Sequence, residues 1–320
     1  MRGMTWDHPR GYAPLRAFGG GVDWDVQPLE DFEARPLREL AGSYDLVVLD
    51  HPGLGAALTG GALLPLDEVL SPDDLAACAA TSAGPTWASY RMDGRQWALP
   101  IDAATQVGAY RPDRLATPPA TWHDVARTVR DVPSALCLGG PHAMLTLVAL
   151  TGHEIEALAL LKEMWPYVDQ EVSLGNPIAV HDALAGGRIA YCPLVYGYLA
   201  YPRLAWTAAP AWTGGGRPLS VLGGTGLAVT THAAGRLGEV RAWIRAFLDP
   251  AVQTGLVPRH GGQPAHAAFW TGDTTLAHAR IRPRYDGWIA VQSAGSAVVR
   301  DCVTGRISPP EALARIEELS

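Results

Sequence analysis

Lysine is almost absent from this chain of 320 residues: Lys162 is the only one, and arginine supplies the other basic side chains. Acidic residues outnumber Lys and Arg by 32 to 25, which gives a formal net charge of -7. A protein that binds nucleic acid through its phosphates needs clustered Lys and Arg. The composition therefore argues against a nucleic-acid partner.

Cysteine is also scarce, and no two cysteines are close enough in sequence to form a CxxC pair. The four are Cys78, Cys137, Cys192 and Cys302. Zinc sites and dense disulfide frameworks show closer or more regular spacing, so we interpret these residues as small apolar core side chains. The sequence also lacks the GxSxG and HExxH motifs of serine hydrolases and zinc proteases. We expect no metal and no cofactor.

Long apolar runs are missing as well. None approaches the ~20 residues of a membrane span, and no apolar segment of the signal-peptide type precedes Trp6. We therefore expect no membrane span. As the sequence stands we expect a cytoplasmic protein, or a periplasmic or extracellular one if a leader was removed.

What is present is a globular composition, 48% hydrophobic and 18% charged, with strands and helices in alternation. Residues 43–55, SYDLVVLDHPGLG, read as an apolar strand, a polar loop and a helix start, and residues 4–18 have the same form. Residues 21–29 predict a further strand, and the MDG at 92–94 predicts a hairpin turn. Such units are typical of an α/β fold with its functional edge at the carboxyl ends of the strands.

Helix starts are also readable. Thr121 follows a proline-rich stretch and has Asp124 three residues later, which predicts an N-cap. Ser308 precedes two prolines and an amphipathic run, which predicts another N-cap near the end of the chain.

Several segments, in this order, resemble the solute-binding proteins of carbohydrate-type ABC transporters (extracellular solute-binding protein family 1). They are YDLVVLDHPGLGAALTGGALLPLDEVL, YRMDGRQWALPIDAATQVGAYRPDRLATPPATWHDVARTV, DALAGGRIAYCP and RAWIRAFLDPAVQTGLVPRHGGQPAHAAFW. The second, with its DG-x-x-aromatic-ALP and PP-x-TW elements, is the most specific. The likeness covers roughly residues 40–270.

The resemblance implies a two-lobe α/β fold of the periplasmic-binding-protein-like (type II) class, with a ligand cleft between hinged lobes. Lobe one is expected to hold residues 1–105 plus 230–270, and lobe two residues 106–229 plus 271–320. The implied partners are a small-molecule ligand and, if the protein is exported, a membrane permease.

The first helix is expected to depart from that family. The stretch PLRAF is followed by Gly19, Gly20 and Gly21, so we expect a helix of about five residues that adds little packing. A natural or engineered shortening explains the glycines, and so does a loosened cleft edge that admits a bulkier ligand or a partner.

Asp-His-Pro occurs twice, at 7–9 and 50–52, each time after an apolar strand. If those strands are parallel neighbours, Asp7, His8, Asp50 and His51 lie together at the lip of the cleft. Carboxylates accept hydrogen bonds from hydroxyls and imidazoles donate or accept them. Arg10 is a forked donor suited to a carboxylate or phosphate. Each copy is explained equally well as a turn in which Asp binds backbone N–H groups.

Other candidates come from aromatic and glycine-rich stretches. His142 follows Gly139-Gly140-Pro141, where a helix N-terminus is able to hold an anionic group. Aromatic side chains with a polar tip suit a sugar-like ligand, although such residues are commonly core residues. The complete set of candidate ligand contacts is Trp6, Asp7, His8, Arg10, Tyr12, Asp50, His51, Asp102, His142, Asn176, Tyr191, Tyr196, Gly224 and Thr225.

The leading hypothesis is a binding protein, without covalent chemistry, for a small polar ligand that is sugar-like or a polar carboxylate. The alternative is a cytoplasmic enzyme on the same scaffold, in which His8 or His51, paired with Asp7 or Asp50, serves as general acid or base. A third possibility is an intracellular sensor or carrier whose closed form binds a protein partner.

Overall fold

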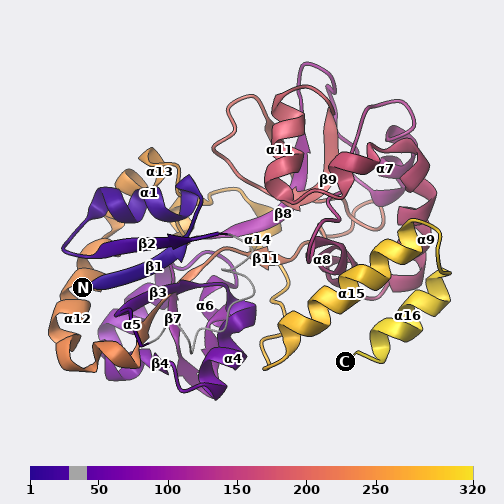
Figure 1. The fold of residues 1–320 in the computed structure, drawn as a ribbon. Helices are drawn as coiled ribbons and strands as arrows, with labels where there is room; N and C mark the ends of the chain where they lie inside the picture. The colour runs from indigo at the N-terminus through magenta and orange to yellow at the C-terminus, as the bar shows by residue number, and fades with distance from the viewer. Residues whose placement is uncertain (29–41, 320) are drawn as a thin grey trace. The chain divides into compact units, whose positions relative to one another are not determined.

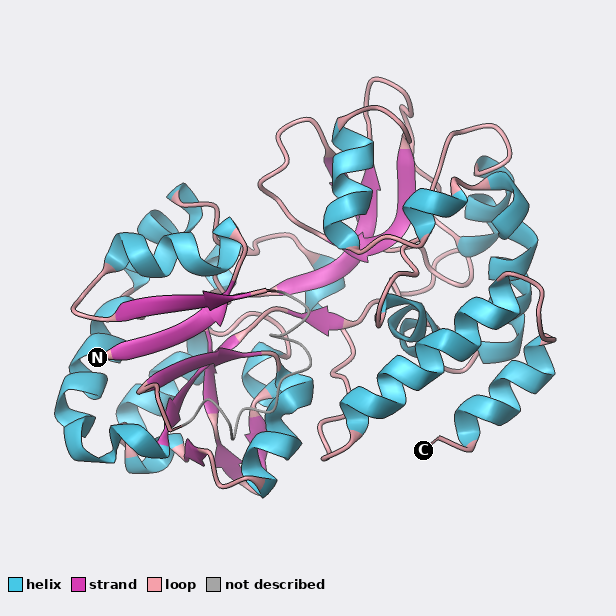
Figure 2. Cartoon of the chain, in the orientation of Figure 1, coloured by secondary structure: helices cyan, strands magenta, loops and turns pink. Residues whose placement is uncertain are grey.

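The computed structural model describes residues 1–28 and 42–319, and these form two compact units (Figure 1). The first unit comprises residues 1–104, 223–272 and 281–289, and the second comprises residues 105–222, 273–280 and 290–320. The chain therefore passes between the units several times. Each unit combines a sheet with helices (Figure 2).

The sheet of the first unit has the order β2-β1-β3-β12-β4, with β7 paired to β12. Strand β1 lies parallel to β2 and β3, whereas β12 is antiparallel to β3, β4 and β7. The strands of this unit are β1 (Arg2–Trp6), β2 (Asp23–Gln27), β3 (Leu46–Leu49), β4 (Leu63–Leu64), β5 (Arg91–Met92), β6 (Arg95–Gln96), β7 (Ala98–Pro100) and β12 (Gly226–Thr230).

Apolar side chains are buried on both faces of this sheet. On β3, Leu46 and Val48 belong to one hydrophobic cluster and Val47 and Leu49 to another, as the alternation of a strand requires. Helices and short turns cover the faces: α1 (Pro9–Phe18), α4 (Leu54–Thr59), α5 (Pro72–Thr81), α6 (Thr86–Ser89), α12 (Leu237–Phe247), α13 (Val257–Arg259), η1 (His51–Gly53), η2 (Leu66–Glu68), η4 (Thr231–Arg236), η5 (Val252–Leu256) and η6 (Ala267–Phe269).

The expectation of a five-residue first helix is wrong. Helix α1 has 10 residues, because His8 caps it and Pro9 occupies its first position, where a missing N–H costs nothing. Its Leu15 is 1% exposed and belongs to the core. Gly19, Gly20 and Gly21 follow the helix, all with φ between 63° and 79°, so they form a left-handed turn into β2.

Other local expectations are confirmed. The MDG turn joins β5 to β6, with Asp93 at φ 52° and Gly94 at φ 76°, the pattern of a type I′ hairpin. Thr121 and Ser308 are N-caps whose hydroxyls accept from the backbone N–H three residues on.

The sheet of the second unit has β8 at its centre. Strands β9, β10 and β11 all pair with it. Its elements are β8 (Ala104–Tyr110), β9 (Tyr191–Tyr196), β10 (Ala205–Thr207), β11 (Leu222–Gly223), α7 (Trp122–Thr128), α8 (His142–Ala149), α9 (Glu154–Met164), η3 (Trp165–Tyr167), α10 (Gln170–Ser173), α11 (Pro177–Ala185), α14 (Thr274–Ala277), α15 (Trp288–Val303) and α16 (Pro309–Glu317). Cys137 and Cys192 lie in its apolar core. No helix in the described part of the chain is long and apolar enough to cross a membrane.

Apart from shifts of one or two residues at their boundaries, the units differ from the expected lobes in residues 223–229 and 281–289. Residues 223–229 were expected in lobe two, but β12 pairs with β3 and β7 in the sheet of the first unit. Residues 281–289 also lie in the first unit, because Arg282 pairs with Asp50 and Arg284 donates to the carbonyls of Ala88, Ser89 and Arg91.

Candidate functional site

The two Asp-His-Pro copies follow strands that are parallel neighbours. Gly3 pairs with Leu46 and Met4 with Val47, so Asp7 and Asp50 each come three residues after a paired position. Carboxyl ends of parallel strands meet at one edge of a sheet. The two strands are therefore parallel neighbours, as the hypothesis required, and both copies follow them at the same edge of the first unit's sheet.

The first copy opens α1 and leaves a carboxylate in solvent. The ring of His8 stacks on the indole of Trp6, with centroids 5.1 Å apart and planes 11° apart. His8 Nδ1 accepts from the backbone N–H of Arg10 at 3.1 Å, which caps the helix. Asp7 is exposed, and its own N–H donates to Gln27 O at 2.7 Å. Asp7 is therefore available to a ligand, beside a half-buried imidazole.

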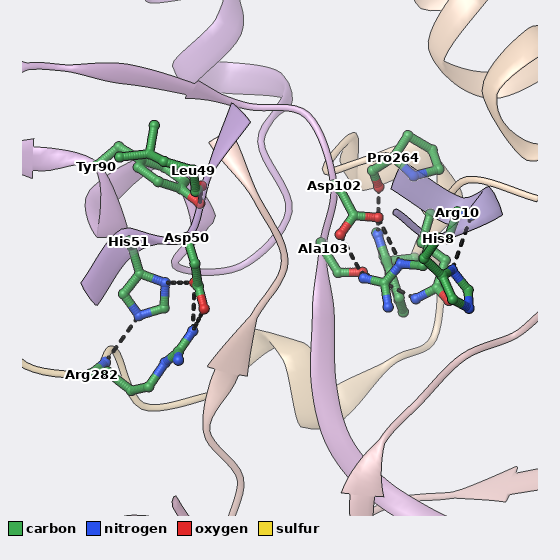
Figure 3. A network of polar contacts seen from close by, with 12 residues as sticks. His8, Arg10, Leu49, Asp50, His51, Tyr90, Asp102, Ala103, Pro264 and Arg282 are labelled. Carbon is green, nitrogen blue, oxygen red and sulfur yellow. Dashed lines mark hydrogen bonds and ion pairs between the residues drawn. The ribbon is translucent and has the colours of Figure 1, made fainter. Parts of the chain in front are cut away.

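Behind this copy lies a buried ion pair (Figure 3). Arg10 Nε donates to Asp102 Oδ1 at 2.8 Å and Arg10 Nη2 to Asp102 Oδ2 at 2.6 Å, in a two-pronged arrangement. The same Nη2 also donates to Ala103 O at 3.2 Å. The two side chains are only 4% and 10% exposed. Burial raises the pKa of Asp102, against the opposing charge of Arg10.

Backbone bonds fix Asp102 in place. Thr225 O accepts from the N–H groups of Ile101 and Asp102, and Thr225 N–H donates to Asp102 O at 3.0 Å. A Cβ on Gly224 would lie 2.2 Å from Asp102 O, and Gly224 has φ 96°, so glycine is required there. Gln263 Nε2 donates to Ala103 O at 3.1 Å. Gly224 and Thr225, expected as ligand contacts, thus lie against the segment that carries Asp102.

The second copy forms a different cluster. Both carboxylate oxygens of Asp50 accept from Arg282 Nη2, at 2.5 and 2.6 Å. His51 Nδ1 lies 3.2 Å from Asp50 Oδ1, and His51 Nε2 accepts from the N–H of Arg282 at 3.2 Å. The imidazole of His51 is thus held between Asp50 and Arg282, as Figure 3 shows.

Burial and charge set the protonation of this second cluster. Burial, aided by the positive charge of Arg282, lowers the pKa of His51 from 6.5 to about 4, so the imidazole is neutral near pH 7. Burial alone would raise the pKa of Asp50, but Arg282 and His51 hold it well below its usual range. Asp50 therefore stays ionised, and Arg282 is its counter-ion.

Tyr90 lies against the second cluster. Its ring meets His51 edge to face at 6.2 Å, and its hydroxyl donates to Leu49 O at 3.2 Å. Burial raises the pKa of Tyr90 well above 10, and the charges of Asp50 and Asp102 both raise it further. The pKa of this one phenol therefore depends on both carboxylates. The two buried arginines of the edge offset the charges of Asp50 and Asp102, and Asp7 adds a third, exposed carboxylate.

Sequence reasoning missed three residues that organise this edge: Tyr90, Gln263 and Arg282. Arg282 lies outside the segments that carry the family resemblance and 232 positions from Asp50, so no local spacing pointed to it. The dense arginine of residues 280–284, RIRPR, was the available signal. Gln263 stands in a Gly-Gly-Gln-Pro turn, which predicted a bend but not a bond to Ala103.

The aromatic candidates of the first unit have structural partners. Trp6 is 4% exposed and belongs to the main hydrophobic cluster. Tyr12 is half-buried on α1, with the guanidinium of Arg16 4.8 Å from its ring centroid. Of the two, Trp6 supports the site, because the ring of His8 stacks on its indole.

The candidates of the second unit have the following positions. Tyr191 is fully buried in β9, so it is a core residue and not a ligand contact. Asn176 caps α11 by accepting from Ala179 N–H at 3.0 Å. His142 meets the ring of Tyr196 at 5.9 Å, and the Tyr196 hydroxyl donates to Leu222 O.

The start of α8 is occupied by a side chain of its own unit. Ser296 Oγ accepts from Met144 N–H at 3.1 Å and donates to Pro141 O at 2.9 Å. Arg300 Nη1 donates to the carbonyls of Leu138 and Gly140 in the preceding turn. The expected anion site at this helix start is therefore corrected to a structural contact with α15.

Metal-ligating side chains do not gather in the described residues: no three His, Cys, Asp or Glu side chains lie close enough together to hold an ion. The chemistry available at the edge of the first sheet is hydrogen bonding from Asp7, His8 and the buried pairs behind them.

Comparison with known proteins gives structural likeness without sequence likeness. No family model and no curated protein matches the chain. Among solved structures, the GacH receptor of Streptomyces glaucescens, studied with acarbose, has a TM-score of 0.79 at 15% identity, covering 99% of this chain and 96% of that one. The chain has the fold of this receptor.

Two further structures agree. A solute-binding protein of an ABC transporter from Agrobacterium radiobacter K84, in complex with ribitol, has a TM-score of 0.79 at 14% identity, over 99% of this chain and 97% of that one. Maltose-bound MalE3 of T. maritima has a TM-score of 0.79 at 15% identity, covering 100% of this chain and 98% of that one. The predicted fold class and the resemblance in fold are confirmed over the whole chain. The site residues rest on the geometry of this chain itself.

Proposed function

We propose that the chain is a binding protein for a small, uncharged, hydroxyl-rich ligand, held at the carboxyl edge of the first unit's sheet. The observation that carries this is that both arginines of the edge are already paired, while the carboxylate of Asp7 is exposed. Arg10 is paired with Asp102 and Arg282 with Asp50, each through two short hydrogen bonds. Such an edge has no guanidinium available to an anionic ligand, and it offers the exposed carboxylate of Asp7 as an acceptor for hydroxyls.

The same pairing argues against a ligand with a carboxylate, which the sequence analysis kept as an alternative. A ligand carboxylate that sought a guanidinium would have to displace Asp102 or Asp50 and leave that carboxylate buried without its partner. A ligand hydroxyl leaves both ion pairs intact, because it donates to carboxylate oxygens that remain available. The solved neighbours support this choice, since their partners are acarbose, ribitol and maltose.

Asp7 and His8 are the proposed direct contacts. Asp7 is exposed and accepts from a ligand hydroxyl, and the half-buried ring of His8, stacked on Trp6, provides an adjacent surface. Trp6, Arg10 and Asp102 form the support beneath them.

Isothermal titration calorimetry with maltose, maltotetraose and ribitol tests the proposal, with gluconate as the charged comparison. We expect at least one neutral compound to bind and gluconate to bind more weakly. Asp7→Asn should weaken that binding about tenfold, the loss of one charge-assisted hydrogen bond. The matched control is Asp23→Asn, an exposed Asp at the opposite end of the sheet, beside Arg2.

Two outcomes would overturn this proposal. Tighter binding of gluconate than of any neutral compound contradicts the ligand class. Equal affinity in Asp7→Asn and in the parent, with both folded, contradicts the assignment of the contact.

We propose no catalysis. His51, a candidate base, is fully buried with Nε2 bonded to Arg282 N–H, and Nδ1 of His8 accepts from Arg10 N–H. As partner we propose the permease of an ABC transporter, with the protein acting outside the cytoplasmic membrane. A neighbour named as the solute-binding protein of an ABC transporter supports the partner, and one named as a putative oligosaccharide periplasmic-binding protein, from Synechococcus sp., supports the location. Fractionation of cells that express the native gene tests the location, and recovery only from the cytosol would contradict it.

A further inference from the structure

The edge strand β2 ends beside the first Asp-His-Pro copy. Strand β1 lies between β2 and β3 and is parallel to both, so all three strands have their carboxyl ends at one edge of the sheet (Figure 1). The last residue of β2 is Gln27. An amide side chain therefore stands at the same edge as the proposed contacts Asp7 and His8.

The backbone joins Gln27 closely to that copy. Gln27 is the register partner of Trp6, and its carbonyl accepts from the N–H of Asp7 at 2.7 Å. Register partners on neighbouring strands project their side chains to the same face, from backbones about 4.8 Å apart. The ring of His8 stacks on Trp6. The side chain of Gln27 therefore begins next to Asp7 and on the face of the sheet that carries Trp6.

The two ends of the Gln27 amide have different surroundings. Its Oε1 is buried, although the residue as a whole is only half-buried. Its Nε2 keeps contact with solvent, and within residues 1–28 and 42–319 it has no hydrogen-bond partner. An amide nitrogen carries two N–H donors. Gln27 therefore presents donors that a ligand in solvent is able to reach.

The three other glutamines of the first unit use this nitrogen within the protein. Each donates through Nε2 to a backbone carbonyl. The bonds are those from Gln96 to Ala98 O at 2.8 Å, from Gln253 to Phe247 O at 2.8 Å and from Gln263 to Ala103 O at 3.1 Å. Gln27 is the exception among the four, and it is the one that ends a strand at this edge.

A carboxylate and an amide nitrogen complement two different oxygens of a ligand. The carboxylate of Asp7 accepts hydrogen bonds, whereas Nε2 of Gln27 donates them. Each hydroxyl of a sugar or polyol is both a donor and an acceptor, so two neighbouring hydroxyls satisfy both side chains. Because Asp7 and Gln27 belong to adjacent chain segments, the two ligand oxygens that they reach lie close together, as on neighbouring carbons.

We propose that Gln27 is a specificity-determining contact of this site, which donates through Nε2 to one oxygen of a neutral sugar or polyol while Asp7 accepts from the hydroxyl on a neighbouring carbon. This inference rests on the proposed function, and it names the group that the site recognises, an adjacent pair of hydroxyls. A single hydroxyl satisfies only one of the two side chains.

Isothermal titration calorimetry of the full chain with maltose, maltotetraose and ribitol tests the contact. For each compound that binds the parent, Gln27→Ala should weaken binding about fivefold, the loss of one neutral hydrogen bond. Gln27→Glu keeps the size of the side chain but places an acceptor opposite the ligand oxygen, so it should weaken binding more than Gln27→Ala. Gln170→Ala, which changes an exposed glutamine of the second unit, is the matched control and should bind as the parent does.

A double-mutant cycle with Asp7→Asn tests whether the two side chains hold one pair of hydroxyls. Residues that bind neighbouring groups of one ligand are energetically coupled, so their effects are not additive. The double variant Asp7→Asn with Gln27→Ala should therefore lose less affinity than the product of the two single losses. Thermal unfolding of each variant shows that it is folded at the temperature of the titration.

The possible outcomes separate this inference from the proposed function. Weaker binding in Gln27→Ala, and weaker still in Gln27→Glu, establishes the donor. Parent-like affinity in either Gln27 variant, while Asp7→Asn is weakened, would overturn the inference and leave the proposed function standing. Losses that multiply fully in the double variant would overturn the shared pair of hydroxyls. Failure of all three neutral compounds to bind the parent would overturn both the inference and the proposed function.

Discussion

The same tripeptide, Asp-His-Pro, follows two adjacent parallel strands and lies in a different environment after each. In the first copy Asp7 is exposed and His8 caps a helix; in the second Asp50 is paired and His51 is fully buried. The difference comes from distant partners. Asp102 pairs with Arg10, just after the first copy, whereas Arg282 reaches the second copy itself. The position of the motif in its strand determines where its side chains leave the backbone. Segments distant in sequence determine which groups those side chains contact.

The two ion pairs also differ in their access to water. Asp102 is 10% exposed and Arg10 4%, while Asp50 is 22% exposed and Arg282 5%. Breaking a buried pair by removing one partner costs about 3–5 kcal/mol, because the remaining charge is buried alone. Access of water to the remaining charge reduces that cost. The first pair should therefore be the more sensitive of the two.

The largest effect is expected from Asp102→Ala, which leaves the guanidinium of Arg10 buried without a carboxylate. We expect the free energy of unfolding to fall by about 3–5 kcal/mol, measured by urea titration of the first unit's transition. Arg10→Met with Asp102→Leu together should recover most of the loss, since no unpaired charge remains. A loss in Asp102→Ala smaller than that in Asp50→Ala would reverse the comparison.

Acid should act on the second cluster through His51. Its pKa is about 4 in the folded protein and 6.5 as its ordinary value. Between these values the unfolded chain binds the proton and the folded chain does not, so stability falls as pH falls. Across that window the loss amounts to about 3 kcal/mol at 1.36 kcal/mol per pKa unit.

His51→Gln is the control for the acid effect, because glutamine keeps an acceptor and does not titrate. Thermal unfolding of parent and variant between pH 7 and pH 4 gives the comparison. The difference in stability between them should shrink as pH falls. A constant difference across this window would show that His51 is not held neutral.

Much of this edge was predictable from the sequence, because its determinants are local. The apolar runs before each Asp-His-Pro predicted β1 and β3. The length of α1 was also accessible, since Pro9 at the first helical position is a start signal. The interior Pro14 obscured it, because proline usually interrupts a helix.

Pairings between distant segments were beyond local reasoning. Asp102 and Arg10 are 92 positions apart, and Asp50 and Arg282 are 232 apart. Periodicity and turn chemistry indicate the direction of a side chain relative to its own helix or strand. They do not indicate which distant segment packs against that side chain. The burial of Tyr191 was missed for the same reason.

A moderate effect is expected from Arg282→Met. Removal of the guanidinium leaves Asp50 without its counter-ion, and because Asp50 retains contact with water we expect a loss of about 2 kcal/mol. The charge of Arg282 also lowers the pKa of His51. The variant should therefore lose less stability between pH 7 and pH 4 than the parent.

The control for Arg282 is Arg91→Met, which removes an exposed arginine from the same unit. It should leave both stability and acid sensitivity unchanged. Equal acid sensitivity in Arg282→Met and the parent would mean that burial alone sets the protonation of His51.

The smallest effect is expected from His8, the counterpart of His51 in the first copy. His8→Ala removes the acceptor for Arg10 N–H, and loss of an N-cap costs about 1 kcal/mol. His8→Asn restores an acceptor at the same position and should recover most of that loss. Chemical denaturation of the three proteins measures it. Because His8 only caps its helix while His51 joins a buried cluster, His51→Ala should cost more than His8→Ala. Equal costs would mean that the two copies contribute alike, whatever their partners.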